Sequence, residues 1–394
     1  MKVFRIFSPL AAAALAACGS AAGPGTATIQ DFRAAAPTSD KLAISQNDGD
    51  SPQGNDASDS SAIAQALTTP DCHPHLFVRT HEIIGRVNRH FAKFLHHVED
   101  LIEDNPLTNG ETKTWENVRG GIDRKFTMTR TLNADGSVTF DFELDLASVP
   151  ASGSPSFVKV MWGSITHVGP AAEDKDAGAG QLVENKGTVT FDFTALASVK
   201  TSERARGQIT DTFDNVHDPD KGVKRTATVV LTNFTPEEGD GHGPRNGTFS
   251  WEREPSVGGK LKFDDTVTLF CLPNPAGLQS DLTAVSRWYK ADGGQVHGRS
   301  DARATGIELP DGGVDTWMGV TCAKGQTTSM PADGFWLMKL EDSTGATDPS
   351  FARSAQVGVD PCDPVFGDVP ILANNSKDYD FSKSFTEITF PNEW

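Results

Sequence analysis

Hydrophobic residues follow two different periods along this chain. Between residues 81 and 104 they recur every three or four positions, which places them on one side of an α-helix. Pro74 and Pro106 bound this segment, and the pattern predicts an amphipathic helix over 75–104. Such a helix must bury its apolar stripe against another element, because packing supplies most of its stability.

After this helix the chain alternates apolar and polar residues with a period of two. The clearest run, GSVTFDFELDLASV at 136–149, puts apolar side chains on one face of a strand and acidic side chains on the other. A nearly identical run, GTVTFDFTALASV, returns at 187–199. Two copies suggest a duplicated hairpin, and convergence of two strands is the alternative.

Nine further alternating runs lie before, between and after these two copies, joined by turn sequences such as NADG, DPDKG and PDGG. Eleven strands without intervening helices predict a mainly β fold, a large curved antiparallel meander. Because each strand has one apolar face, we expect a half-barrel or barrel-like sheet packed on the long N-terminal helix. We therefore assign residues 71–370 to one β-rich domain, which includes the N-terminal helix, and residues 371–394 to a C-terminal tail.

The N-terminus has a positive start, Lys2 and Arg5, followed by an apolar run too short to span a bilayer as a helix. This pattern is typical of an export signal. The run ends in LAAC, residues 15–18, which resembles the lipobox of bacterial lipoproteins. The resemblance implies a signal peptide over 1–17 and acylation of Cys18, whose palmitate-type chains would anchor the protein to a membrane.

The resemblance also bears on localisation. Gly19 and Ser20 follow the cysteine, in place of the aspartate that keeps members of this family in the inner membrane. We therefore expect a lipid anchor in the outer membrane of a bacterial cell envelope, with the domain facing either the periplasm or the exterior. A soluble secreted protein in which Cys18 has no special role is the alternative.

Residues 18–70 are rich in small and acidic residues, and the stretch QNDGDSPQGNDASDSS has neither a period nor an apolar residue larger than alanine. Such a sequence cannot bury enough apolar surface to fold. We expect this segment to be a disordered acidic tether between the anchor and the domain.

Four cysteines remain after Cys18, and an even count in an exported chain indicates two disulfides. Three pairings are possible, and we expect the two bridges Cys72–Cys271 and Cys322–Cys362. No CxxC spacing occurs, so a structural zinc site is not predicted.

Charge narrows the range of partners. The chain carries 53 acidic and 35 basic residues, a net charge of −18. Such a surface repels phosphate backbones, so nucleic acid is excluded as an expected partner. The partners that remain are the membrane, through acylated Cys18, and an apolar ligand or a basic envelope protein.

Two weak metal sites come from the pattern of histidines and carboxylates. His90 and His97 share one edge of the helical stripe, but they are two turns apart, about 10.5 Å along the axis. The simpler interpretation is that both histidines lie at the edge of the buried stripe, with part of the ring buried and one ring nitrogen in contact with water. The functional alternative is a helix contact that changes with pH. If the repeated strands are adjacent, Asp141 and Asp192 would form a weak divalent-cation site.

No catalytic motif is complete. HEIIG at 81–85 lacks the second histidine of a zinc protease, and GRSDA at 298–302 lacks the last glycine of a nucleophile elbow. No catalytic residue and no cofactor is therefore predicted, and an enzyme is the less favoured class.

The C-terminal third contains VSRWYKADGGQVHGRSDARATG, followed by the segments with Cys322 and Cys362. This region resembles uncharacterised extracytoplasmic bacterial lipoproteins of unknown function, and it carries no site residues from them. We expect a lipid-anchored, non-catalytic binding or structural module of the envelope. A carrier of an acyl chain is the second hypothesis, and a hydrolase the third. The carrier needs a cavity lined by aromatic side chains: Phe140, Phe142, Phe191, Phe193 and Trp251.

Overall fold

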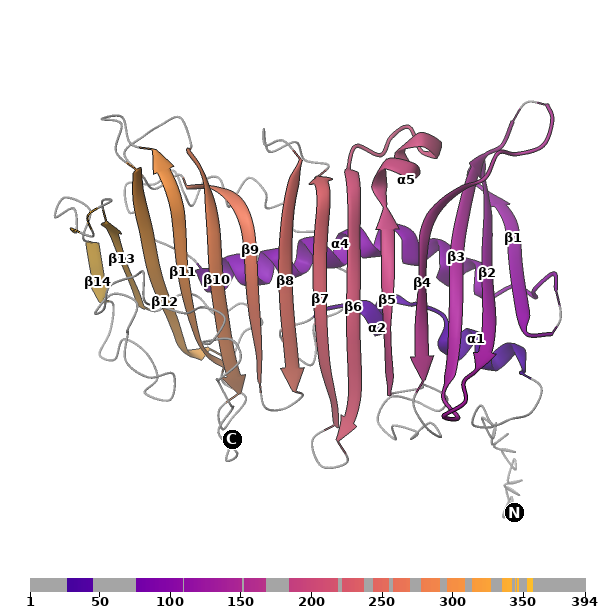
Figure 1. Cartoon of the computed structure of the whole chain (residues 1–394), viewed down its shortest axis with the longest axis horizontal. Coiled ribbons are helices and arrows are strands. Elements are labelled where there is room, and N and C mark those ends of the chain that lie inside the picture. The colour runs from indigo at the N-terminus through magenta and orange to yellow at the C-terminus, as the bar shows by residue number, and fades with distance from the viewer. Residues whose placement is uncertain are drawn as a thin grey trace, which may run out of the picture.

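The structure is a computed structural model, and its described part is drawn as coloured ribbon in Figure 1. The described residues are 27–44, 76–108, 110–150, 152–167, 184–218, 222–236, 244–254, 258–269, 278–290, 296–308, 314–326, 335–341, 344, 346 and 353–356. The predicted signal peptide 1–17, the acylation site Cys18 and the predicted tail 371–394 lie outside them.

One antiparallel sheet dominates the described residues. It has fourteen strands in chain order, and each pairs with its sequence neighbours, so the sheet is a simple meander (Figure 1). The strands are β1 (Thr112–Arg119), β2 (Ile122–Leu132), β3 (Val138–Ser148), β4 (Val158–His167), β5 (Asn185–Asp192), β6 (Arg206–Asp218), β7 (Gly222–Thr235), β8 (Arg245–Glu254), β9 (Gly258–Leu269), β10 (Leu278–Lys290), β11 (Val296–Glu308), β12 (Val314–Gln326), β13 (Phe335–Glu341) and β14 (Arg353–Gln356).

The prediction of a mainly β antiparallel meander is confirmed, but the sheet is not closed. Within the described residues β1 pairs only with β2 and β14 only with β13, so these two strands form the edges. The barrel-like alternative is therefore wrong, because closure requires the first and last strands to pair.

Local turn chemistry explains part of the meander. Arg119 pairs with Ile122, so Gly120 and Gly121 alone connect β1 to β2. Their φ angles are 62° and 79°, the left-handed conformation that a tight hairpin turn needs at both central positions. Glycine adopts it without a steric penalty.

The sheet has two unlike faces. We call the side that carries the helices the helix face and the opposite side the outer face. In β3 the burial alternates as the sequence predicts, and the buried side chains on the helix face are Val138, Phe140, Phe142, Leu144 and Leu146. The acidic residues between them are exposed or half-buried on the outer face.

The repeated sequence does not form a duplicated hairpin. Its second copy starts as β5 but turns at Asp192 into helix α5 (Phe193–Val199), and its first copy, β3, is separated from β5 by β4. The Asp192 carboxylate caps α5 by accepting a hydrogen bond from the Ala195 amide at 2.8 Å. After Asp192 the alternation of the first copy is replaced by TALASV, which contains good helix formers.

Helix α4 (Leu76–Ile102) lies on the helix face and crosses the strands (Figure 1). Near its N-terminus the Thr80 hydroxyl contacts the Ser286 hydroxyl of β10 at 2.5 Å. In its middle Phe91 stacks on Phe191 of β5, with ring centroids 4.8 Å apart. The buried apolar residues of α4 are Ile84, Val87, Phe91, Phe94, Leu95, Val98 and Leu101.

The predicted tether is wrong for residues 27–44. They form α1 (Ile29–Ala35) and α2 (Ser39–Leu42), and Phe32 is fully buried between Trp115 and Phe140. This segment is too short to build a core alone, but the sheet and α4 supply the rest of its core. Polar contacts hold it: the Asn88 side chain bonds both the N–H and the carbonyl of Ile44, at 2.9 and 2.6 Å.

Candidate binding cleft between strands β8 and β9

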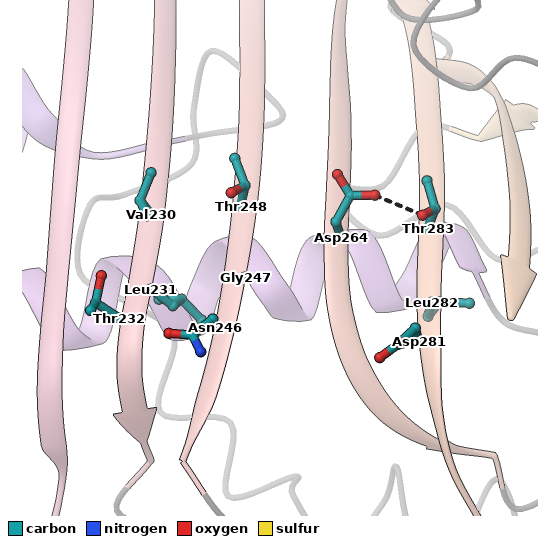
Figure 2. Close-up of a pocket in the computed structure, with 10 residues that line it drawn as sticks. All are labelled: Val230, Leu231, Thr232, Asn246, Gly247, Thr248, Asp264, Asp281, Leu282 and Thr283. Carbon is teal, nitrogen blue, oxygen red and sulfur yellow. Dashed lines mark hydrogen bonds between the residues drawn. The ribbon is translucent and has the colours of Figure 1, made fainter. Parts of the chain in front are cut away.

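The hydrogen-bonded sheet opens between β8 and β9. Pairing of these strands ends at Thr248 and Asp264, although both strands continue beyond this pair. Within the described residues the register between β8 and β9 runs from Glu254–Gly258 to Thr248–Asp264, whereas β9 stays paired with β10 as far as Leu269. Figure 2 shows the two ribbons diverging below the labels of Thr248 and Asp264.

A row of backbone irregularities explains this opening. Gly207 of β6 and Asn233 of β7 have φ angles of 86° and 47°, and the register shifts at both places. A Cβ atom at Gly207 would lie 2.2 Å from the Asn233 carbonyl oxygen, so only glycine fits. The side chain of Asn246 in β8 accepts a hydrogen bond from the Asn233 amide at 2.9 Å. Because bulges increase local twist, β7 and β8 turn away while β9 follows β10.

The opening holds a cleft of about 410 Å³. Its lining comes from β7, β8, β9 and β10: Val230, Leu231, Thr232, Asn246, Gly247, Thr248, Asp264, Asp281, Leu282 and Thr283 (Figure 2). Leu231 and Leu282 belong to the helix face and are buried, so they form an apolar floor. The hydroxyl, amide and carboxylate groups belong to the outer face.

Asp264 is the best-defined charged group of the cleft. Its Oδ1 accepts a hydrogen bond from the Thr283 hydroxyl at 2.7 Å, and its Oδ2 lies 3.1 Å from Lys262 Nζ. The Asp264 side chain is still 43 % exposed, so it can meet a further cation. The cleft therefore combines an apolar floor, hydrogen-bonding walls and one accessible carboxylate.

The predicted histidine pair does not come together. His90 is buried in the core, its ring 5.4 Å from Phe193 and 5.0 Å from Phe234 between centroids, so it is not a boundary residue. Burial lowers the pKa of His90 to about 3. Two turns further along α4, burial and the Arg124 charge lower the pKa of His97 to about 4. Neither imidazole titrates near neutral pH, which argues against the pH-sensitive helix contact.

The predicted carboxylate site is also wrong. Asp141 on β3 pairs with Thr129 and Ser164, and Asp192 lies two strands away, where it caps α5 and accepts a hydrogen bond from Gln208. The sequence alone could not show that β4 comes between them. Across the described residues, no three histidine, cysteine, aspartate or glutamate side chains are close enough to hold a metal ion.

One buried carboxyl group was missed by the sequence analysis. Asp211 of β6 lies on the helix face with none of its surface exposed, opposite Val189 and Val229 in the neighbouring strands. Neither oxygen has a hydrogen-bond partner among the described residues, and burial raises the pKa of Asp211 to about 8. The signal was present in the chain, because an aspartate occupies an apolar position of the alternating run ITDTF.

A buried charge cluster was missed as well. Asp301 of β11 bonds Arg287 of β10 at 2.8 Å and Arg299 at 2.7 Å, and all three side chains are almost fully buried on the outer face. The run HGRSDARATG has no alternation of apolar and polar residues from which this burial could be predicted. In this part of the sheet side chains are buried on both faces.

The described residues test few of the predictions about cysteines and membrane attachment. Cys322 is buried in β12, while Cys72, Cys271 and Cys362 lie outside the described residues, so the disulfide pairing stays a prediction. No α-helix in the described ranges has the combination of length and apolar character that crossing a membrane would need.

The aromatic residues expected to line a carrier cavity are packed against other side chains. Phe191 contacts Phe91 and Phe94, with centroids 4.8 and 5.1 Å away, and Phe193 contacts Phe94 at 4.9 Å. All five residues named for that cavity are buried. In the described core, helix side chains occupy the place that a ligand would need.

The chain matches no known protein family, no curated protein and no solved structure.

Proposed function

We propose that this protein is a lipid-anchored, non-catalytic binding module of the bacterial cell envelope, and that the β8–β9 cleft is its binding site. The observation that carries the proposal is the cleft itself, where strand pairing stops and about 410 Å³ opens on the outer face. Its lining contains hydroxyls, an amide and carboxylates, which are groups that can hold a ligand.

The scaffold of this module is the curved sheet packed on α4, and the anchor is the acylated Cys18. The anchor rests on the lipobox at 15–18, and outer-membrane localisation rests on Gly19 and Ser20. A lipid anchor at one end and a ligand cleft far along the chain suit a protein that holds its ligand close to a membrane. A carrier of acyl chains is less well supported, because the described aromatic core is filled.

Replacement of the acylation site tests the anchor. Cys18→Ser should release the protein from the membrane fraction of a bacterium that processes lipoproteins, since the mutant lacks the thiol to which the lipid is attached. Cell fractionation and intact-mass measurement report the result, and Thr26→Ala, which leaves residues 15–20 unchanged, serves as the control. A Cys18→Ser protein that stays on membranes with unchanged mass would refute the anchor.

The binding site is tested with a photo-crosslinking amino acid at position 248. We expect adducts of defined mass from the anchored protein in whole cells when Thr248 carries the crosslinker, because this side chain lines the cleft. The same amino acid at Thr188, also on the outer face but far from the cleft, is the matched control. Equal adduct patterns from both positions, or none from position 248, would show that the cleft is not the binding site.

A further inference from the structure

We propose that one corner of the domain faces the membrane, the corner formed by the N-terminal end of α1, the end of β2 and the β2–β3 turn at residues 133–137. We call it the anchor corner. The inference rests on the proposed function, because it takes acylated Cys18 as the membrane anchor. It deepens that function by naming the surface that the anchor holds next to a phospholipid bilayer.

The first argument is that residues 27–44 are fixed to the domain. Phe32 is fully buried, with ring centroids 6.5 Å from Trp115 and 5.3 Å from Phe140. Arg33 donates hydrogen bonds to three backbone carbonyls at the end of α4, at 2.6, 3.0 and 2.9 Å. A segment that is tied down by such contacts moves with the domain, so it adds no length to the tether.

The second argument is the length of chain that is left between the anchor and the domain. Nine residue steps lead from Cys18 to Ala27. Fully extended they reach about 32 Å, because each residue spans at most about 3.6 Å. As a flexible coil rich in glycine and alanine they span about 15–18 Å on average. A tether over all of 18–70 would leave the orientation of the domain open, whereas this short link keeps Ala27 close to the lipid headgroups.

The third argument is the place where the short link meets the domain. Figure 1 shows α1 beside the lower ends of β2 and β3. Leu132, the last residue of β2, is 47 % exposed there, and the Asn133 amide bonds the Ser137 carbonyl at 2.9 Å, which fixes the turn. The opposite ends of these strands lie about 35 Å further away, beyond the average reach of the link. The bilayer therefore faces the anchor corner.

The covalent link, and not charge, holds this corner in place. The net charge of the chain is −18, and Asp135 in the turn is exposed. Anionic headgroups repel such a surface. Because salt screens this repulsion, the anchor corner should lie as close to the bilayer at high salt as at low salt.

The test uses the full acylated chain in vesicles of phosphatidylethanolamine and phosphatidylglycerol that carry an energy-accepting dye on the headgroup. A fluorescent amino acid replaces Ala134 in the turn or, as the matched control, Val149 just beyond the other end of β3. Both residues are exposed. Because the two sites are about 35 Å apart and energy transfer falls steeply with distance, transfer should be about twofold or more stronger from position 134.

Two insertions distinguish the short link from the rest of the N-terminal region. About twenty glycine and serine residues between Pro24 and Gly25 lengthen the link, so the ratio of transfer from the two positions should fall to about one. The same insertion between Gly54 and Asn55 should leave the ratio unchanged, because residues 27–44 stay fixed to the domain.

The outcomes separate the orientation of the domain from its anchoring. If the protein carries acyl chains and floats with the vesicles, but transfer is equal from both positions or stronger from position 149, the anchor corner is refuted and the anchor stands. An insertion after Gly54 that changes the ratio as much as the insertion after Pro24 also refutes the anchor corner. If the protein has no acyl chain and does not float with the vesicles, the proposed anchor falls together with this inference.

Discussion

Asp211→Asn should make the protein more stable at pH 8, by an amount on the order of 5 kcal/mol. Asp211 is fully buried, and burial raises its pKa to about 8 from the ordinary value of 3.8. In the unfolded chain the carboxyl loses its proton above about pH 4, whereas the folded protein keeps it bound up to about pH 8. Stability therefore decreases as the pH rises through this window, and asparagine, which does not ionise, removes that loss.

The pH dependence separates this explanation from a simple packing effect. The ratio of the folding constants of mutant and parent should grow roughly tenfold per pH unit between pH 4 and pH 8, and should level off outside this window. Urea denaturation at several pH values measures it. Asp214→Asn is the matched control, because Asp214 is on the same strand but exposed on the outer face. A stability difference that does not change with pH would show that Asp211 has an ordinary pKa.

Asp301→Ala should destabilise the protein by about 3–5 kcal/mol, because it removes the carboxylate that two buried guanidinium groups share. Arg287 and Arg299 contact Asp301 at 2.8 and 2.7 Å, and the Asp301 side chain has no exposed surface. Breaking a buried pair leaves charge in a place where water cannot solvate it. Thermal or urea denaturation measures the loss, and Asp141→Ala serves as an exposed control that should change stability by less than about 0.5 kcal/mol.

The conservative variant Asp301→Asn refines this prediction. It keeps an oxygen that can accept hydrogen bonds but loses the charge, so its effect should lie between those of the parent and Asp301→Ala. If Asp301→Ala unfolds at the same denaturant concentration as Asp141→Ala, the cluster does not hold β10 and β11 together. Asp301 then contributes to packing only.

The sheet could be predicted because its signal repeats in every strand. Burial in β3 follows the alternation of VTFDFELDL, and the glycine pair at 120–121 marks a tight turn by its own conformational needs. The repeated run at 187–199 misled the prediction, because one aspartate, Asp192, acts as a helix cap in the second copy. In the first copy the equivalent position continues a strand.

The tether prediction failed for a different reason. Half of residues 27–44 are apolar, most of them alanine, but the prediction judged residues 18–70 together, and the polar stretch QNDGDSPQGNDASDSS made the whole segment look disordered. Yet Phe32, Leu42 and Ile44 are buried against the sheet and α4, and Arg33 donates hydrogen bonds to carbonyls at the end of α4. Composition measures what a segment can bury by itself, whereas this segment uses surface that other elements provide.

The sequence by itself determined which residues face the core, where most strands turn and that the chain forms an antiparallel meander, because these properties depend on neighbours a few positions away. Only the tertiary structure decided where the sheet opens, which short segment completes the core and which carboxyl group stays protonated. These three properties depend on contacts between residues that are distant in the sequence. Examples are the contact of Thr80 with Ser286 and the contacts that link Gly207, Asn233 and Asn246 on three neighbouring strands. Register and local dielectric are set by all the strands together, so no single stretch of sequence contains them.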